Sequence, residues 1–290
     1  MTPRNLFDLL LLAALWGGSF LFMRYAAPAF GAVPLIWLRV AIAAACLLPL
    51  LWWRGQLGIL WSRAGAMLVV GVFNSALPFV LFAWALLSIS AGLASILNAV
   101  TPIFTALIAL LWLGERLNKS QAAGLLIGFV GVLLLAADKA DFKPGGSGWA
   151  IVAMLGATLS YGFVANYMRR TLVGVPSLAA AAGAKLMASL VLSPLAYWFW
   201  PAVMPDLKAW LAVVCLGVGS TALAFVLFFR LLTEIGAARA VTVTFLVPVF
   251  GVLWGKLFLG ETITTPMLLG GAVIVLGTAL ATGIVRLPAR

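Results

Sequence analysis

The chain has 290 residues, of which 65% are hydrophobic and 9% charged, and its formal net charge at pH 7 is +11. A soluble domain carries about 25% charged residues, so this composition excludes a soluble globular protein with a polar surface. The basic residues lie in short links between apolar runs, an arrangement that orients a membrane protein and does not indicate a nucleic-acid partner.

Residues for catalysis and metal binding are scarce in this sequence. It contains no histidine, and its two cysteines, Cys46 and Cys215, each lie inside an apolar run without a CxxC partner. Histidine is the commonest metal ligand, and no phosphate-binding glycine loop is present, so no catalytic or metal-binding set is apparent. We therefore expect a protein that is not an enzyme and that uses neither a metal nor a cofactor.

Ten apolar segments follow one another along the chain. A helix that crosses a bilayer needs about 20 such residues. Boundaries placed at glycines, prolines and charged clusters give the segments 5–25, 32–53, 64–87, 91–113, 121–137, 148–167, 176–200, 209–232, 237–259 and 266–285. The sequence therefore predicts an all-α integral membrane protein with ten transmembrane helices, the first of which is retained and not cleaved as a signal peptide.

Lysine and arginine residues predict the orientation of these helices. With a cytoplasmic N-terminus, the inner ends and loops hold Arg4, Arg54, Arg63, Arg116, Lys119, Arg169, Arg170, Arg230, Arg239, Arg286 and Arg290, and the outer ones hold Arg24, Lys139, Lys143, Lys208 and Lys256. This excess of positive charge inside predicts that both termini are cytoplasmic, in a multi-pass protein of the plasma membrane, which is the inner membrane of a bacterium.

The sequence repeats itself at an offset of 146 residues, the separation of Pro102 and Pro248. At this offset PIFTALIALLWLGE (102–115) and PVFGVLWGKLFLGE (248–261) agree at seven of fourteen positions. GVFNSALPFVLF (71–82) and GVGSTALAFVLF (217–228) agree at eight of twelve. Five spans is an odd number, so the second copy crosses the membrane in the opposite direction. We predict two five-helix inverted-topology repeats, residues 1–137 and 148–290, joined by an external linker at 138–147, an arrangement typical of secondary transporters.

Several phrases of the sequence resemble a known family. LWGGSFLFMRYA (15–26), LIWLRVAIAA (35–44) and the two segments ending in LGE are similar to EamA-type members of the drug/metabolite transporter superfamily. The resemblance covers essentially the whole chain. It implies an alternating-access cavity surrounded by the first four helices of each half, and export of amino acids, related metabolites or drugs. Small four-helix relatives use an acid in their first helix for proton coupling; here no acid follows Asp8 in that helix, so this device is not expected.

Polar side chains are rare deep in the spans, where such groups usually face the bundle interior or a water-filled cavity. Asn74 and Ser220 occupy equivalent positions of the two copies, as do Asn98 and Thr244. We predict that these four residues line a substrate cavity. The alternative is that each makes only an interhelical hydrogen bond.

Aromatic and basic residues complete the predicted site. Trp16 and Tyr161 lie in the middle of the first helix of each half, where they would form an aromatic wall for an amphipathic substrate or only pack against neighbours. Arg39 and Lys185 occupy equivalent positions inside the second helix of each half. Each would contact a substrate carboxylate or extend toward the lipid headgroups.

The two equivalent prolines predict interruptions in the fourth helix of each half. Because proline lacks a backbone N–H, Pro102 frees the carbonyl of Asn98 and Pro248 frees that of Thr244. We predict a kink at each proline, about which the end of the helix moves as a gate. The alternative is a kink that does not move.

These observations lead to one expected function and two alternatives. We expect a secondary transporter that exports small organic solutes, such as aromatic or hydrophobic amino acids or related metabolites, by alternating access around a midplane cavity. The alternatives are a membrane scaffold or receptor that does not transport, and a translocator of lipid precursors with a lateral opening to lipid. The expected partners are a small-molecule substrate and the bilayer, and the protein is expected to be a monomer or a loose homodimer.

Overall fold

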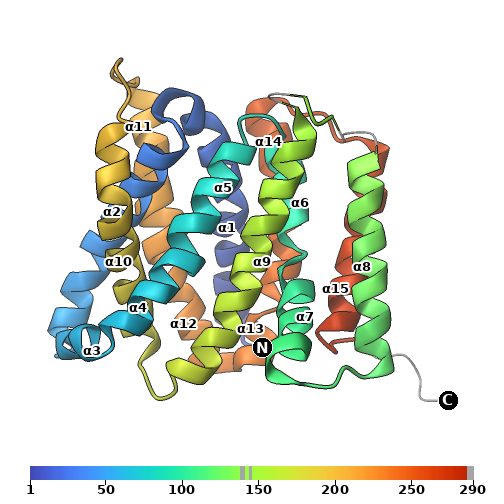
Figure 1. Cartoon of the computed structure of the whole chain (residues 1–290), viewed down its shortest axis with the longest axis horizontal. Helices are drawn as coiled ribbons and strands as arrows, with labels where there is room; N and C mark the ends of the chain where they lie inside the picture. The colour runs from blue at the N-terminus through green and yellow to red at the C-terminus, as the bar shows by residue number, and fades with distance from the viewer. Residues whose placement is uncertain (138–140, 144–145, 286–290) are drawn as a thin grey trace.

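The structure, a computed structural model, describes residues 1–137, 141–143 and 146–285, and every regular element in these ranges is a helix (Figure 1). Residues 138–140 and 144–145 of the predicted linker, which include Lys139, lie outside the described residues, as do Arg286 and Arg290. Eight helical segments are long and apolar enough to cross a membrane, and two further apolar helices are shorter. The prediction of an all-α membrane protein with about ten spans is therefore confirmed.

The helices of the first half follow the predicted segments closely. They are α1 (Pro3–Phe30), α2 (Ala32–Trp53), the short α3 (Leu57–Ser62), α4 (Ala64–Gly71), the π-helix η1 (Val72–Ala76), α5 (Leu77–Ala85), α6 (Ala91–Asn98), α7 (Thr101–Leu113) and α8 (Lys119–Ala137). The largest difference is at α1, which continues through Pro28 to Phe30. It ends at Gly31, whose φ of 77° is accessible to glycine at little cost.

The second half repeats this order of spans, without a counterpart of α3 among its described residues. Its helices are α9 (Ser147–Thr171), α10 (Ser177–Trp198), α11 (Leu207–Val214), the π-helix η2 (Cys215–Leu223), α12 (Ala224–Ile235), the short α13 (Ala237–Ala240), α14 (Val243–Leu259) and α15 (Thr265–Ala281). Shifted by 146, residues 72–76 of η1 fall on 218–222, inside η2. Both copies therefore widen the third span at the same place, and π-turns of this kind are frequent at functional sites.

The fourth span is broken in both halves, but at different places relative to the two prolines. In the first half α6 ends at Asn98 and Pro102 lies in the first turn of α7, where proline is well accommodated. The Asn98 carbonyl instead accepts a hydrogen bond from Thr101 Oγ1 at 2.8 Å. In the second half the break precedes α14, and Pro248 lies inside that helix. The two prolines are equivalent in sequence but not in their position relative to the break.

The repeated LGE phrase ends a helix in both halves. Gly114 and Gly260 have φ values of 68° and 65°, in the left-handed region that glycine adopts most readily. The amides of the following glutamates donate back into the helix, Glu115 to the carbonyl of Ala109 at 3.2 Å and Glu261 to that of Gly255 at 3.1 Å.

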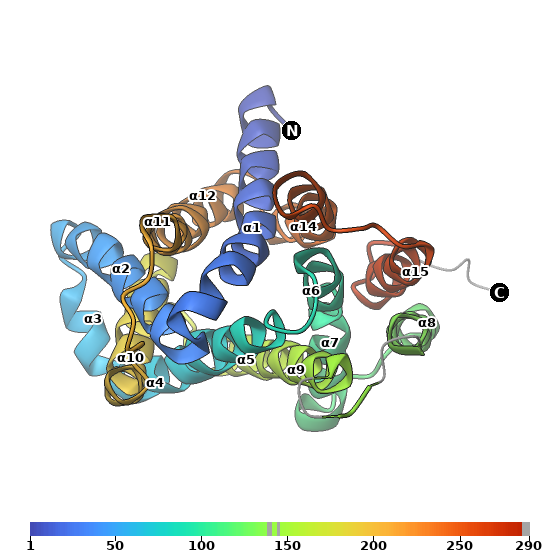
Figure 2. The ribbon, with the colours of Figure 1, turned by 90° about the horizontal axis from the view of Figure 1, so that it is seen from above.

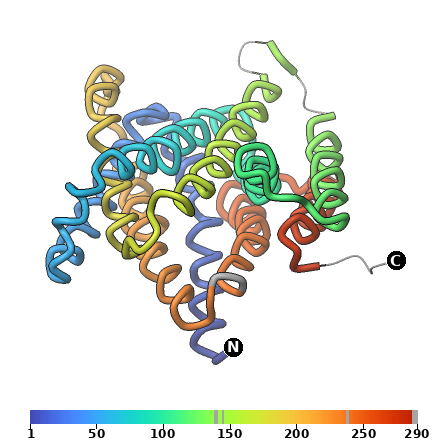
Figure 3. Tube along the Cα trace, turned by 60° about the horizontal axis from the view of Figure 1, so that its bottom comes forward, coloured from blue at the N-terminus to red at the C-terminus, as the bar shows by residue number. Residues whose placement is uncertain are grey.

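The two halves pack into each other. The first span of each half packs along the fourth span of the other, α1 along α14 and α9 along α7, and the second spans α2 and α10 pack together. The fifth spans α8 and α15 lie side by side at one edge of the molecule (Figures 2 and 3). Glycines allow this pair to approach closely: a Cβ atom added at Gly131 would lie 2.7 Å from Ile274 Cγ1 and 2.9 Å from the Ile274 backbone nitrogen.

This contact predicts that Gly131→Val destabilises the protein. The added side chain would meet the backbone of α15, and overpacking of this kind costs about 1–3 kcal/mol. We expect the melting temperature of the purified protein in detergent, followed by tryptophan fluorescence, to fall by several degrees. Gly65→Val is the matched control, because no atom of the described residues lies within 4 Å of a Cβ atom at Gly65. Equal melting temperatures for the two variants would contradict the prediction.

Candidate functional site

A cavity of about 520 Å³ lies in the middle of the bundle. Its described lining residues come from the first four spans of both halves, and none belongs to α8 or α15. At one end it is lined by Leu172, Val175 and Ser177, of the turn between α9 and α10 and the start of α10. Ser177 is exposed, so the cavity reaches the molecular surface at this end, which is the end that holds the N-terminus (Figure 1).

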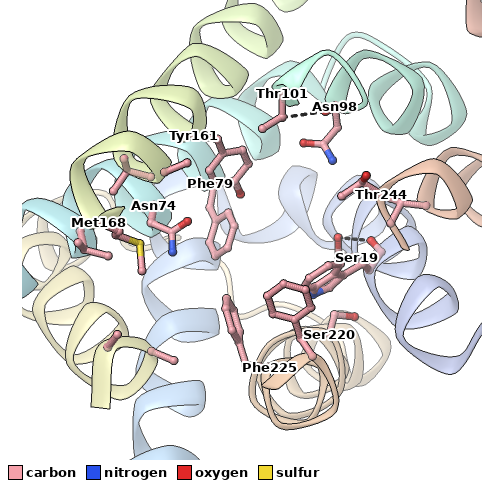
Figure 4. Close-up of a pocket in the computed structure, with 18 of the residues that line it drawn as sticks. Ser19, Asn74, Phe79, Asn98, Thr101, Tyr161, Met168, Ser220, Phe225 and Thr244 are labelled. Carbon is pink, nitrogen blue, oxygen red and sulfur yellow. Dashed lines mark hydrogen bonds between the residues drawn. The ribbon is translucent and has the colours of Figure 1, made fainter. Parts of the chain in front are cut away.

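All six predicted substrate-binding residues line this one cavity: Trp16, Asn74, Asn98, Tyr161, Ser220 and Thr244. Figure 4 shows Asn74 and Tyr161 on one side and Ser220 on another, with Asn98 and Thr244 between them. Arg39 and Pro102 also belong to the lining, whereas Lys185 and Pro248 do not. The structure therefore brings the predicted residues together; that they bind a substrate remains a prediction.

The aromatic residues of the cavity make the same contacts in both halves. The ring-centroid distances are 5.3 Å for Trp16–Phe228, 6.3 Å for Trp16–Phe225, 5.7 Å for Tyr161–Phe82 and 6.5 Å for Tyr161–Phe79. At the 146-residue offset, Phe79 corresponds to Phe225 and Phe82 to Phe228. The aromatic residue on the first helix of each half thus packs against two phenylalanines on the third span of the other half.

These four phenylalanines line the cavity, and the sequence interpretation missed them. A usable signal was present, because the four belong to the GVFNSALPFVLF repeat and are identical in its two copies. Hydropathy alone could not separate them from phenylalanines on the outside of the bundle, such as Phe7 and Phe258.

The two predicted cations point into the protein and bind hydroxyl groups. Arg39 Nε donates to Thr221 Oγ1 at 2.9 Å, and Lys185 Nζ donates to Ser75 Oγ at 2.6 Å. Arg39 is 3% exposed and Lys185 is fully buried, so neither side chain extends to the lipid headgroups. Ser75 and Thr221 are themselves equivalent at the 146-residue offset, so the two contacts are copies of each other that cross between the halves.

Aromatic rings cover both cations. The Arg39 guanidinium carbon lies 3.8 Å from the centroid of Phe79, and Lys185 Nζ lies 4.5 Å from that of Phe225 and 5.1 Å from that of Phe79. Attraction between a cation and the face of a ring strengthens when water is excluded. Phe79 thus contacts both positive charges.

The π-helices provide the hydroxyl acceptors. Thr221 lies in η2, and its hydroxyl donates to the carbonyl of Leu216, five residues earlier, at 2.8 Å while accepting from Arg39. Ser75 lies at the equivalent place in η1. Each π-helix therefore carries a hydroxyl group that accepts a hydrogen bond from a basic side chain of the opposite half.

Several polar atoms around the cavity have no partner in the described part of the chain. Asn98 Oδ1 and Ser220 Oγ are buried and form no hydrogen bond there, and Ser220 is 1% exposed. Thr244 Oγ1 donates only to the nearby Val241 carbonyl. Among the described residues, these three side chains make no interhelical hydrogen bond. Since buried polar atoms are normally paired, the unpaired ones are candidates for contact with a ligand.

The opposite end of the bundle is held together by Glu261. Its carboxylate accepts the backbone amides of Ala91 at 2.7 Å and Gly92 at 3.1 Å, at the first turn of α6. A carboxylate at this position is favoured by the helix dipole. The equivalent residue of the first half, Glu115, instead forms an ion pair with Arg169. The two ends of the molecule therefore differ, although their sequences are related.

Sequence comparisons find relatives over nearly all of the chain. The model of the EamA-like transporter family matches residues 6–137 and 148–283. An uncharacterized transporter of Archaeoglobus fulgidus is 24% identical over 93% of this chain and 95% of its own length. A probable terminal-alkyne amino-acid exporter of Streptantibioticus cattleyicolor is 26% identical over 94% of this chain and 91% of its own. The uncharacterized inner membrane transporter YedA of Escherichia coli is 26% identical over 67% of this chain and 63% of its own.

A comparison with solved structures supports the fold. One solved crystal structure superposes with a TM-score of 0.67 and 22% identity, and the match covers 98% of both chains. At this sequence identity the match supports the arrangement of the helices and gives no information about a substrate.

The contact between Arg39 and Thr221 predicts that Thr221→Val destabilises the protein. The substitution keeps the shape of the side chain but removes the acceptor, and a hydrogen bond to a charged group contributes about 1.5–3 kcal/mol. We expect a lower melting temperature in detergent. Thr233→Val is the control, since the hydroxyl of Thr233 is exposed and bonds only the Arg230 carbonyl of its own helix. If both variants melt like the parent protein, the contact does not stabilise the fold.

Proposed function

The chain belongs to the EamA-like transporter family, and from this premise we propose that it exports small organic solutes by alternating access around the central cavity. Membership of the family makes the protein a membrane transporter and not an enzyme. The observation that supports the central cavity as the transport site is the meeting of six widely separated polar and aromatic residues in it.

The proposed substrates are aromatic or hydrophobic amino acids and related metabolites. The cavity volume of about 520 Å³ is within the range of about 300–1,000 Å³ of small-molecule sites, which are mostly apolar with a few placed polar groups. In this proposal Trp16 and Tyr161 contact the apolar part of the substrate, and Asn74 and Asn98 contact its polar part. The name of the Streptantibioticus relative, which refers to amino-acid export, favours the same class.

The proposed orientation identifies the side of the membrane from which the cavity is reached in this arrangement. If the basic loops place both termini in the cytoplasm, the surface reached at Ser177 is cytoplasmic. Substrate would then enter from the cytoplasm, while Glu261 holds the outer ends of α14 and α6 together. We propose that the ends of α7 and α14, near Pro102 and Pro248, move when the cavity opens to the other side.

The alternative of a lipid-precursor translocator requires a lateral opening of the cavity toward lipid. A second hollow of about 510 Å³ lies between α1, α11 and α14, and Tyr25, Lys208 and Trp254 contribute to its lining. It shares no lining residue with the central cavity, so it does not provide that opening. The scaffold alternative predicts no flux at all. In vesicles, uptake of a small organic solute would support the exporter, and movement of a lipid precursor across the bilayer would support the translocator. Absence of both would support the scaffold.

We expect Asn74→Ala and Asn98→Ala each to reduce transport of accepted substrates in proteoliposomes. Loss of one hydrogen bond of about 1.5 kcal/mol corresponds to roughly a tenfold fall in the rate at low substrate concentration. Uptake of radiolabelled phenylalanine, leucine and related acids would be measured. Ser193→Ala is the control, because Ser193 lies outside the cavity and its hydroxyl bonds the Leu190 carbonyl of its own helix. Unchanged uptake of every accepted substrate in both Asn variants would contradict the site assignment.

The proposed orientation predicts which surface residues can be labelled from outside the cell. In a variant without Cys46 and Cys215, we expect a cysteine at Lys143 to react with a membrane-impermeant maleimide in intact cells. A cysteine at Arg116 should react only after permeabilisation. Both positions are exposed, so access across the membrane decides the result. The reverse pattern would place the termini outside.

A further inference from the structure

The centre of the bundle contains two basic side chains. Arg39 lines the cavity, and Lys185 lies behind the lining with its Nζ bonded to Ser75. Both groups contact the ring of Phe79, at 3.8 Å for the Arg39 guanidinium and 5.1 Å for the Lys185 ammonium. Their hydrogen-bond partners are neutral: Arg39 bonds a threonine hydroxyl and, at 3.4 Å, the sulfur of Met23.

Every carboxylate that the structure describes is engaged elsewhere. Asp8 and Glu234 pair with Arg230, Glu115 pairs with Arg169, Glu261 caps α6, Asp206 caps α11, and Asp141 accepts the amide of Lys143. None of these six acids lines the cavity. The remaining acid of the chain, Asp138, lies outside the described residues. The described walls of the cavity therefore carry positive charge and no negative charge.

This imbalance has an energetic consequence. A charge removed from water is costly unless an opposite charge or several hydrogen bonds compensate it, and two like charges beside one ring increase the cost. Hydroxyls and aromatic faces compensate only in part. The Nη2 group of Arg39 has no hydrogen-bond partner among the described residues, and a guanidinium binds a carboxylate through two parallel hydrogen bonds. An anion in the cavity would supply the missing charge.

The same imbalance disfavours a positively charged group on the substrate. An ammonium group would enter a space that already holds Arg39 and Lys185, and no described carboxylate lines it. The acceptors available to it are neutral, such as Asn98 Oδ1 and Ser220 Oγ. The walls favour an apolar body, since Trp16, Phe225 and Phe228 are among the lining residues.

Building on the proposed transport function, we propose that the substrate is a net anion: a carboxylate with an aromatic or apolar body and no ammonium group. Arg39 binds the carboxylate directly, and Lys185, held by Ser75, is a second basic group behind the lining. Among the small organic solutes considered above, this selects metabolites that are acids over the zwitterionic amino acids.

Three ligands with the same ring test this proposal. 3-Phenylpropanoate carries only the carboxylate, L-phenylalanine carries the carboxylate and the ammonium, and 2-phenylethylamine carries only the ammonium. We expect calorimetry on the purified full-length protein to give a Kd for 3-phenylpropanoate at least about tenfold below that for L-phenylalanine, and no detectable binding of 2-phenylethylamine. Binding is measured in preference to flux because weak acids also cross bilayers unaided.

Variants test the role of the two cations. Arg39→Gln should weaken binding of 3-phenylpropanoate at least tenfold and reduce its advantage over L-phenylalanine, and Arg39→Lys should restore part of the affinity because it keeps the charge. Lys185→Gln should also weaken binding of 3-phenylpropanoate, by a smaller factor. Arg54→Gln is the control, since Arg54 is an exposed residue at the end of α2 and should leave all three affinities unchanged. Melting curves establish that each variant is folded.

The outcomes separate this inference from the proposed function. If L-phenylalanine binds as tightly as 3-phenylpropanoate, or if Arg39→Gln leaves their ratio unchanged, the net-anion inference is wrong and the proposed export of small organic solutes still holds. If the proteoliposomes transport none of the amino acids and acids tested, the proposed function fails, and the inference fails with it.

Discussion

Buried positive charge is the constraint around which the centre of this protein is organised. Lipid offers no hydrogen-bond partners, so each charged or polar group inside a span must find them within the protein. Arg39 and Lys185 find theirs on the π-helix of the opposite half, at Thr221 and Ser75. These two contacts fix α2 against η2 and α10 against η1. They also join the two halves directly beside the cavity. The same hydrogen bonds therefore hold the halves together and position Arg39 in the cavity wall.

The spans, the two related halves and the polar residues of the cavity could be predicted from the sequence. In a membrane protein, the polarity of a side chain indicates whether it faces lipid or the interior of the bundle. The ten spans follow from hydropathy, and the two related halves follow from a single offset that matches Pro102 to Pro248. Asn74, Asn98, Ser220 and Thr244 were identified only as polar residues deep in spans, and all four line one cavity. A polar side chain at that depth avoids lipid, so its direction within the bundle can be inferred without a structure.

Other features required the structure. A long basic side chain can reach the headgroups or turn inward, and the sequence of α2 does not decide between these for Arg39; the decision lies with Thr221, 182 residues away. The phenylalanines of the cavity were missed because an apolar side chain is equally acceptable to lipid and to a cavity wall. The positions of the π-helices and of the break before α14 were not predicted from the sequence. Pro248 lies within a continuous helix, whereas Pro102 lies in the first turn of one.

The unequal use of Glu115 and Glu261 has a consequence for the energy of the protein. Two residues related by duplication occupy different environments: one caps a helix of the opposite half, and the other forms an ion pair near the surface. In an arrangement with these environments exchanged, Glu115 would lie near Ala237, which corresponds to Ala91. Glu261 would lie near Met23, which corresponds to Arg169, so the ion pair would not be reproduced in the same form. The free energy of that arrangement would differ from that of the present one only through positions at which the copies have diverged, such as Asn98 and Thr244. In a chain built from two inverted copies, the sequence differences between the copies therefore determine which of the two arrangements has the lower free energy when no substrate is bound.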